Sequence, residues 1–399
     1  MAFKYKKYGK RLVRYLSTST PDRTLTLKKC VTKSELKDFA TYGIKLYKGH
    51  PYYVPDLIDD LVNTFLPETN PAFDFCEAIY FLAYRGEKIV GRIAGIINHK
   101  ANDTWNQNHA RFGFVDFEDD DSVVNLLFTA VEDWAISKGC EAIKGPLGFT
   151  DLDPEGMLIE GFDQLSTMIT IYNYPYYPRH LERLGYSKDI DWLEYKIYVP
   201  KIVPERHQRM SDLVRRKYGL RTFKPSSKKE LMDYAQDVFG LINECYQPLY
   251  GVSELSQEQI DYYVKMYFPV VNTDLISLII REEDRKLVAF GITLPSLSKA
   301  LQKAGGKLFP IGFAYMLKAL KDKRPEVVDL LLIAVAPEYQ NKGVNALIFE
   351  ELIPVMNDYQ VKYVESNPEL ETNMSVQLQW NNFKKVNHKR RRSFIKELV

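Results

Sequence analysis

Apolar and polar residues along this chain predict the same order of strands and helices twice. Two β-rich runs between residues 80 and 97 flank a turn at 85–88, which indicates a hairpin. From residue 121 to 138 apolar residues recur at helical spacing, with Asp121 or Ser122 as the expected N-cap and Gly139 as the stop. The first half is completed by predicted strands at 111–117, 140–143 and 192–199 and a short helix at 177–184.

The second half repeats this order. The predicted elements are a helix at 231–243, a hairpin at 275–281 and 286–294, a strand at 327–335, a helix at 344–356, a strand at 362–366, a helix at 374–383 and a strand at 392–398. Residues 299–321 have helical periodicity but no counterpart in the first half, which indicates an insertion. We therefore expect two α/β domains with mixed sheets at 25–200 and 201–399, after a basic leader at 1–24, with two unrelated α/β domains as the alternative.

Composition limits the classes of protein to which this chain could belong. Of the 399 residues, 45% are apolar and 27% charged, which is typical of globular proteins with a full core. The longest apolar runs, such as 330–335, are far shorter than the roughly 20 residues of a membrane-spanning helix. The four cysteines are dispersed and the six histidines lack ligand-like spacing, so we expect no metal, no disulfide framework and a cytoplasmic location.

Two stretches are locally basic, although a net charge of +2 gives no overall field that would recruit nucleic acid. Residues 4–14 fit a transit peptide, a nucleic-acid arm or a solvated leader that packs on the body. Residues 388–392 precede an apolar strand and fit either a phosphate site or a solvated edge strand.

Residues 331–347 carry the most chemical information. An apolar strand that ends at Val335 leads through a turn containing Gly343 directly into a helix. The unpaired N–H groups and the dipole at a helix N-terminus favour an anion, and glycine lets a ligand approach the backbone closely. Because Lys342 adds a positive charge, this turn predicts a pyrophosphate site.

At this point the sequence resembles the GNAT acyltransferase superfamily. The signature of that superfamily is a strand ending in Ala-Val, followed by Gln/Arg-x-x-Gly-x-Gly/Ala. Here Ala334-Val335, Gln340 and Gly343 match, whereas Asn345 replaces the last small residue. The resemblance implies acetyl-CoA or another acyl-CoA as cofactor, held by Val335, Gln340, Asn341, Lys342, Gly343, Val344, Asn345 and Asn373.

The first half resembles the same superfamily through other pieces. Residues 180–186, His-Leu-Glu-Arg-Leu-Gly-Tyr, are similar to its terminal helix signature, and Gly91-Arg92-Ile93 fits the strand after the hairpin. The corresponding cofactor loop, 117–121, has three aspartates and no glycine, so its charge should repel CoA. The resemblance, which spans about residues 25 to 399, therefore implies a tandem GNAT protein whose first domain does not bind the cofactor.

Acyl transfer to an amine needs a base, donors for the carbonyl oxygen and an acid. The resemblance implies that backbone N–H groups near Val335 supply the donors and that Asp329 is the base, with Glu365 as the second candidate. A turn-capping or solvated role is the alternative for Asp329. Relatives often use a tyrosine of the last helix as the acid, but this chain has Leu378 or Trp380 there, so the acid is left open.

Asn367 and Asn373 fit either contacts to the CoA arm or turn formation, and the Gly- and Tyr-rich segment 145–177 fits either an acceptor pocket facing the second domain or a packed interdomain loop. The function expected from the resemblance is an acyl-CoA-dependent N-acyltransferase, with acetyl as the first choice and a small-molecule or peptide amine as acceptor. Two alternatives stay open. One is a non-catalytic CoA-binding scaffold, and the other is a tRNA-dependent aminoacyl transferase of the peptidoglycan type, with the basic run 389–392 holding RNA.

Overall fold

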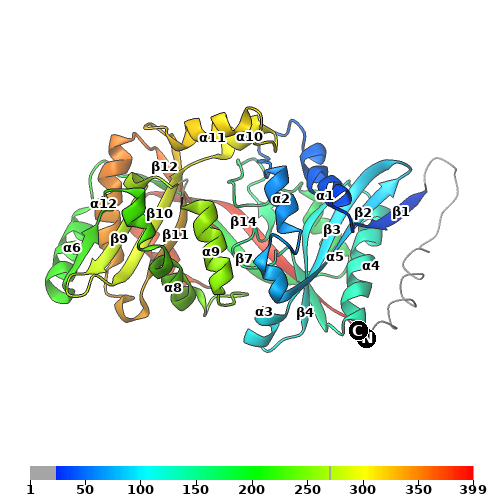
Figure 1. Cartoon of the computed structure of the whole chain (residues 1–399), viewed down its shortest axis with the longest axis horizontal. Coiled ribbons are helices and arrows are strands. Elements are labelled where there is room, and N and C mark those ends of the chain that lie inside the picture. The colour runs from blue at the N-terminus through cyan, green and yellow to red at the C-terminus, as the bar shows by residue number, and fades with distance from the viewer. Residues whose placement is uncertain (1–23, 269–270, 399) are drawn as a thin grey trace.

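The computed structural model describes residues 24–268 and 271–398, so most of the basic leader lies outside the described residues (Figure 1). One 14-stranded sheet runs through both halves in the order β1-β2-β3-β4-β5-β14-β7-β12-β11-β10-β9-β8, with β6 paired to β14 and β13 to β7. The strands are β1 (Leu25–Lys29), β2 (Cys76–Arg85), β3 (Lys88–Asn98), β4 (His109–Phe117), β5 (Ala142–Gly145), β6 (Met157–Glu160), β7 (Ser187–Tyr198), β8 (Leu220–Phe223), β9 (Ile276–Arg281), β10 (Leu287–Pro295), β11 (Val327–Val335), β12 (Tyr363–Ser366), β13 (Glu369–Leu370) and β14 (Lys385–Glu397).

The helices cover both faces of this sheet. They are α1 (Lys33–Leu46), α2 (Ile58–Thr64), α3 (His99–Thr104), α4 (Asp121–Ser137), α5 (Tyr176–Arg183), α6 (Glu205–Tyr218), α7 (Lys228–Met232), α8 (Ala235–Tyr246), α9 (Gln257–Tyr267), α10 (Ser298–Ala304), α11 (Gly312–Leu320), α12 (Asn345–Asp358) and α13 (Met374–Gln379). In the described part of the chain, no helix combines the length and the apolarity that a bilayer crossing requires.

In the first half, the predicted hairpin is confirmed as β2 and β3, and the predicted long helix is confirmed as α4. Its N-cap is Asp120 rather than Asp121 or Ser122, because Asp120 has extended backbone angles and its Oδ1 accepts hydrogen bonds from the N–H groups of Ser122 and Val123. Apolar side chains of β2, β3 and β4 form one cluster with α4 and another, on the opposite face, with α1 and α2.

In the second half, β11 has the predicted bounds, and the hairpin of β9 and β10 is also confirmed. The helix predicted at 231–243 is divided into α7 and α8 around Tyr234, which is the N-cap of α8. The insertion forms α10 and α11, which lie along the top of the molecule in Figure 1. Helices α6 and α9 have no counterpart in the sequence prediction; α6 is rich in charged residues and buries only His207, Ser211 and Val214.

The last strand of each half pairs with the other half. Strand β14 lies between β5 and β7, and β7 in turn pairs with β12, so the two final strands are neighbours at the centre of the sheet (Figure 1). The prediction of an edge strand after residue 388 is therefore wrong: β14 begins at Lys385 and is internal. The domain boundary at residue 200 stays a prediction, because the sheet itself is continuous across it.

Candidate functional site

The candidate site lies where β11 and β12 separate. The two strands pair in parallel only from Val327 to Leu330, after which β11 continues alone to Val335. Thr293 of β10 pairs with Leu330 and Ile292 pairs with Leu332, so Leu331 is the extra residue of a β-bulge. The side-chain amide of Asn367 donates to the carbonyl of Leu331 at this point. One edge of β11 is thus open to a ligand.

The open edge presents both donors and acceptors. Its carbonyl groups are partly used: Tyr246 Oη donates to the oxygen of Ile333 at 3.1 Å, and Gln340 Nε2 donates to that of Val335 at 3.0 Å. The N–H of Ala336 is directed to β10, where it donates to Val288, and N–H directions alternate along a strand. The N–H groups of Ile333 and Val335 therefore point toward the open edge.

The turn after β11 leaves a helix N-terminus uncapped. Asn341 and Gly343 have left-handed backbone angles, with φ of 59° and 80°. Among the described residues, no hydrogen bond from the N–H of Gly343 or Val344 is found, and α12 has no side-chain cap. Free N–H groups at the positive end of a helix dipole suit an anion such as pyrophosphate.

The structure gathers the predicted loop residues and gives several of them contacts of their own. Lys342 Nζ lies 5.5 Å from the ring centre of Tyr218, so its charge stays at the loop. Asn345 turns its side chain away and donates to Gln379 Oε1 at 3.3 Å, which leaves the helix terminus free. Asn373 is not part of the loop: it caps α13 and lines the cavity described next.

A cavity of about 280 Å³ opens beside the separated strands. Its wall is mostly apolar and is built by β10, β11, α8 and α9, including Val238, Phe239, Tyr263, Ile292, Leu294 and Leu332. The opposite wall comes from the first half, where Asp151, Asp153 and Glu155 of the segment 145–177 face the same space. Residues of both halves therefore share one cavity, and the acceptor-pocket interpretation of that segment stays a prediction.

The two predicted catalytic carboxylates are neighbours but differ in environment. Asp329 and Glu365 face each other in the parallel register of β11 and β12, and both are buried. Neither oxygen of Asp329 has a hydrogen-bond partner among the described residues, and burial together with the charge of Glu365 raises its pKa to about 7. Glu365 has a pKa of about 2, because the ammonium of Lys389 and the imidazole of His388 outweigh its burial.

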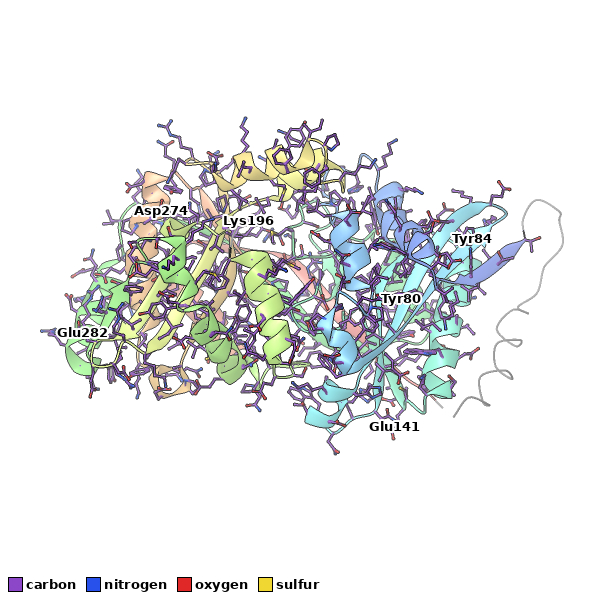
Figure 2. The ribbon with its side chains drawn as sticks, in the orientation of Figure 1. Tyr80, Tyr84, Glu141, Lys196, Asp274 and Glu282 are labelled. Atoms are coloured by element: carbon purple, nitrogen blue, oxygen red, sulfur yellow. The ribbon has the colours of Figure 1, made fainter. Side chains whose placement is uncertain are left out.

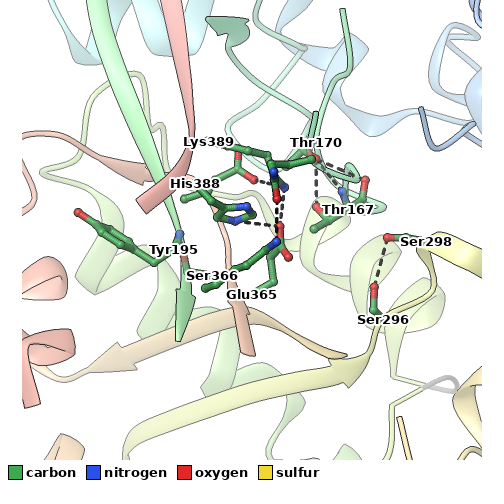
Figure 3. A network of polar contacts seen from close by, with 12 residues as sticks. Thr167, Thr170, Tyr195, Ser296, Ser298, Glu365, Ser366, His388 and Lys389 are labelled. Atoms are coloured by element: carbon green, nitrogen blue, oxygen red, sulfur yellow. Dashed lines mark hydrogen bonds and ion pairs between the residues drawn. The ribbon is translucent and has the colours of Figure 1, made fainter. Parts of the chain in front are cut away.

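Glu365 belongs to an ionic cluster that fills the centre of the sheet (Figure 3). Lys389 Nζ lies 2.5 Å from Glu365 and 2.9 Å from Glu194, and Arg391 Nε lies 2.5 Å from Glu194. Figure 2 shows Lys196 near the middle of the molecule, where its ammonium donates to Gln164. Because the buried ammonium of Lys389 holds Glu365 in its ionised form, this carboxylate is a weak base. Neither Asp329 nor Glu365 is among the described residues that line the cavity.

The same contacts correct the interpretation of the basic run 388–392. Lys389 and Arg391 are fully buried, and the guanidinium groups of Arg390 and Arg392 pair with Asp191 at 3.2 and 2.7 Å. All four charges are paired with carboxylates of the protein, and only Arg390 and Arg392 are partly exposed. The RNA-binding role considered for this run therefore has no unpaired cation of residues 389–392 to rest on.

Comparison with known proteins shows which solved structures have a similar fold. No protein-family model matches the chain. A tandem GNAT protein from the clavulanic acid biosynthesis pathway superposes with a TM-score of 0.51 and 13% identity, over 94% of this chain and 99% of that one. The chain has a tandem GNAT fold. A glucosamine N-acetyltransferase region of a fungal multi-domain enzyme also superposes at 0.51, with 11% identity, over 96% of this chain and 39% of that protein.

Two curated proteins are similar in sequence. A bacterial ceramide synthase of Caulobacter vibrioides is 29% identical over 313 residues, which cover 77% of this chain and 80% of that protein. Protein YghO of Escherichia coli is 28% identical over 351 residues, or 87% and 88% of the two chains. Both alignments extend across the two halves of the tandem GNAT fold.

The two GNAT-like halves differ at their corresponding helix termini. In the first half, Asp120 caps α4, while Asp119 and Asp121 lie 2.7 and 3.3 Å from the ring nitrogens of His180. A carboxylate of the protein itself thus occupies the place where α12 leaves its N–H groups free. The contrast supports the predicted assignment of the cofactor to the second half, which stays a prediction.

Glu369 is a candidate that the sequence prediction missed. It lines the cavity three residues beyond the end of β12, and Trp380 Nε1 donates to its Oε1 at 2.7 Å. Its other oxygen has no hydrogen-bond partner among the described residues. Burial raises its pKa to about 7, despite the hydrogen bond from the indole. No local pattern marks this residue, because its environment is created by the cavity.

The three carboxyl groups that the first half contributes to the cavity wall also have raised pKa values. Burial raises the pKa of Asp151 to about 6 and also raises those of Asp153 and Glu155, with the neighbouring carboxylates adding to the effect at Glu155. Asp153 accepts a hydrogen bond from the N–H of Thr150 at 3.0 Å, whereas Oδ1 of Asp151 has no partner among the described residues. The described residues contain no group of His, Cys, Asp or Glu side chains arranged to hold a metal ion.

Proposed function

We propose that this protein transfers a long acyl chain from CoA to the amino group of a long-chain amine held between the two halves. The observation that carries this proposal is the largely apolar cavity of about 280 Å³ that adjoins the separated strands and has carboxylates in its wall. An acetyl group needs little room, whereas an apolar cavity of this size stabilises an alkyl chain by removing it from water. We therefore prefer a long acyl chain to the acetyl group that the sequence favoured.

The sequence relative named bacterial ceramide synthase supports this choice, because ceramide formation joins a fatty acyl group to the amine of a long-chain base. The acidic wall suits the same acceptor. An ammonium group near Asp151 and Glu155 would favour their ionised forms and neutralise the charge that burial makes costly.

Acyl-CoA fits the second half through its phosphates and its thioester. The N–H groups of Gly343 and Val344, with Lys342, would bind the pyrophosphate, and the open edge of β11 would hold the arm that leads to the thioester. Val335, Gln340, Asn341 and Asn345 complete this set in the proposal. Asn373, on the cavity side, would contact the far end of the arm or the substrates.

The neutral amine attacks the thioester carbonyl carbon and forms the C–N bond, and the C–S bond breaks. The proton lost by the nitrogen passes through Glu369 to the departing sulfur, so CoA leaves as its thiol. Glu369 would accept the amine proton because its free oxygen adjoins the cavity and its pKa is about 7. The N–H groups of Ile333 and Val335 would stabilise the developing oxyanion. Glu369 replaces Asp329 as the preferred base, since Asp329 is not part of the cavity wall.

The test is a mass-spectrometric assay of the purified protein with acetyl-, octanoyl- and palmitoyl-CoA and a long-chain amine such as sphinganine. We expect the N-acyl product and free CoA, with palmitoyl-CoA preferred. The variant Val238→Phe, which places a larger side chain in the apolar wall and so narrows the cavity, should reduce turnover of palmitoyl-CoA more than that of octanoyl-CoA. Absence of product from every donor, with CoA still bound, would favour the non-catalytic scaffold. Preference for acetyl-CoA would contradict the long-chain assignment alone.

A further inference from the structure

The insertion that forms α10 and α11 carries an exposed apolar surface. Phe309, Ile311, Phe313, Tyr315 and Leu317 are 70, 60, 46, 37 and 45% exposed, and they lie within one stretch of the chain. The other exposed large apolar side chains of the described residues are scattered along the sequence. A concentrated apolar patch on a protein surface marks an interaction site.

The opposite face of the insertion is fixed to the protein body. Met316 and Leu320 pack with Val54, Leu297 and Leu301. The inner face of the insertion is therefore already occupied, and the exposed apolar side chains lie on its outer face. Gln302 Nε2 donates to the carbonyls of Pro51 and Tyr53 at 2.9 Å, and the N–H of Ile58 donates to Gly306. The insertion is therefore a tethered platform that joins both halves, along the top of Figure 1.

The charge of the platform is of one sign. Residues 298–321 contain five lysines and no aspartate or glutamate. Lys303, Lys307, Lys318 and Lys321 are exposed and have no carboxylate partner among the described residues. A surface that combines aromatic and aliphatic side chains with unpaired lysines complements an anionic lipid layer, whose headgroups attract the cations while the apolar side chains enter the interface.

We propose that the α10–α11 platform docks the protein on the surface of an anionic membrane. A second copy of the chain fits less well, because a two-fold contact through this face would place lysines against lysines. The platform also adjoins the cavity: Met168 lines the cavity and packs in the cluster beneath α11, and β10, which forms part of the cavity wall, leads directly into α10. Docking would thus place the cavity close to the lipid phase. The proposal does not depend on the acyl-transfer reaction.

The test is co-sedimentation of the full chain with two kinds of vesicle, one of phosphatidylcholine and one of equal parts phosphatidylcholine and phosphatidylglycerol. We expect binding to the anionic vesicles that weakens in high salt and little binding to the neutral ones. The triple variant F309S/I311S/F313S should bind at least tenfold more weakly. A second variant, K303Q/K307Q/K318Q, should lose about fivefold for each lysine replaced, which separates loss of charge from any loss of folding.

The matched control is V31S/I202S/L213S, which removes three exposed apolar side chains elsewhere and should bind vesicles as the parent does. The basic sequence 4–14 is present in every variant, so a contribution from it would not distinguish them. Failure of the parent to sediment with either vesicle, or equal binding by F309S/I311S/F313S and the parent, would overturn the proposal. A dimer in sedimentation velocity that the same variant abolishes, without vesicle binding, would identify a second copy as the occupant and would also overturn it.

Discussion

Replacing Glu369 by glutamine separates the proposed base from its surroundings. Glutamine has nearly the same shape and can still accept the hydrogen bond from Trp380 Nε1, which lies 2.7 Å from Oε1. It cannot accept a proton from an amine. If Glu369 is the general base, Glu369→Gln should lower kcat by about 10²- to 10⁴-fold, with little change in the affinity for acyl-CoA.

Glu369→Gln should lower kcat but raise the free energy of unfolding. Burial raises the pKa of Glu369 from 4.5 to about 7 in the folded protein. Below pH 4.5 the carboxyl group is neutral in the folded and unfolded chains; as the pH rises to 7 only the unfolded chain ionises, so the free energy of unfolding falls. The shift corresponds to roughly 3 kcal/mol. Glu369→Gln should therefore be more stable than the parent by up to that amount at pH 8, and similar to it at pH 4.

The assays are kcat/KM for N-acylation between pH 5.5 and 9 and the free energy of unfolding in urea at pH 4 and 8. The parent rate should rise with pH through an apparent pKa near 7, and the variant should lose this step. Glu371→Gln is the matched control, because Glu371 pairs with Lys188 outside the cavity and should change neither measurement appreciably. A variant at Glu369 that kept the rate and pH profile of the parent would refute its role as base.

Three further substitutions test the other parts of the site. Gly343→Asp should weaken CoA binding at least tenfold in calorimetry and cost roughly 1–2 kcal/mol of stability, because its φ of 80° disfavours any side chain; unchanged CoA affinity would remove the proposed pyrophosphate site. Lys389→Met should destabilise the protein by about 3–5 kcal/mol in urea unfolding, since it removes the one ammonium that contacts both buried carboxylates, Glu194 and Glu365, whereas the exposed Lys201→Met should have no such effect; equal values would contradict the ionic-cluster argument. Asp151→Asn combined with Glu155→Gln should raise KM for the amine at least tenfold with little change in KM for acyl-CoA, and steady-state kinetics in which only the latter changed would refute the acceptor assignment.

Local sequence patterns predicted the elements that depend on neighbouring residues. Strand β11 was predicted with its observed bounds because a short apolar run, 327–335, ends in a proline-containing turn. The helix predicted to start directly after Gly343 is α12, which begins at Asn345. The backbone geometry of the turn around Gly343, including its unpaired N–H groups, could therefore be anticipated, and the tandem GNAT fold is confirmed.

Contacts between distant residues could not be predicted in this way. Lys389 reads as a solvated charge in the sequence, but its partner Glu194 lies 195 residues earlier in the chain. Only the pairing of β14 with β7 brings the two together. Glu369 has the same difficulty, since its raised pKa arises from burial in a cavity whose walls come from both halves.

The exchange of final strands explains why the two halves have to be considered as one unit. A cut at residue 200 would remove β14 from its place between β5 and β7, and would separate Lys389 and Arg391 from Glu194. Separate halves would each expose an unpaired strand edge and bury uncompensated charge, so their failure to bind CoA would carry no information about where the cofactor lies. Single substitutions in the intact chain avoid this difficulty. The half whose helix terminus is capped by its own Asp120 still supplies β7 to the sheet and the acidic wall to the cavity, which gives a physical reason for its presence that does not depend on cofactor binding.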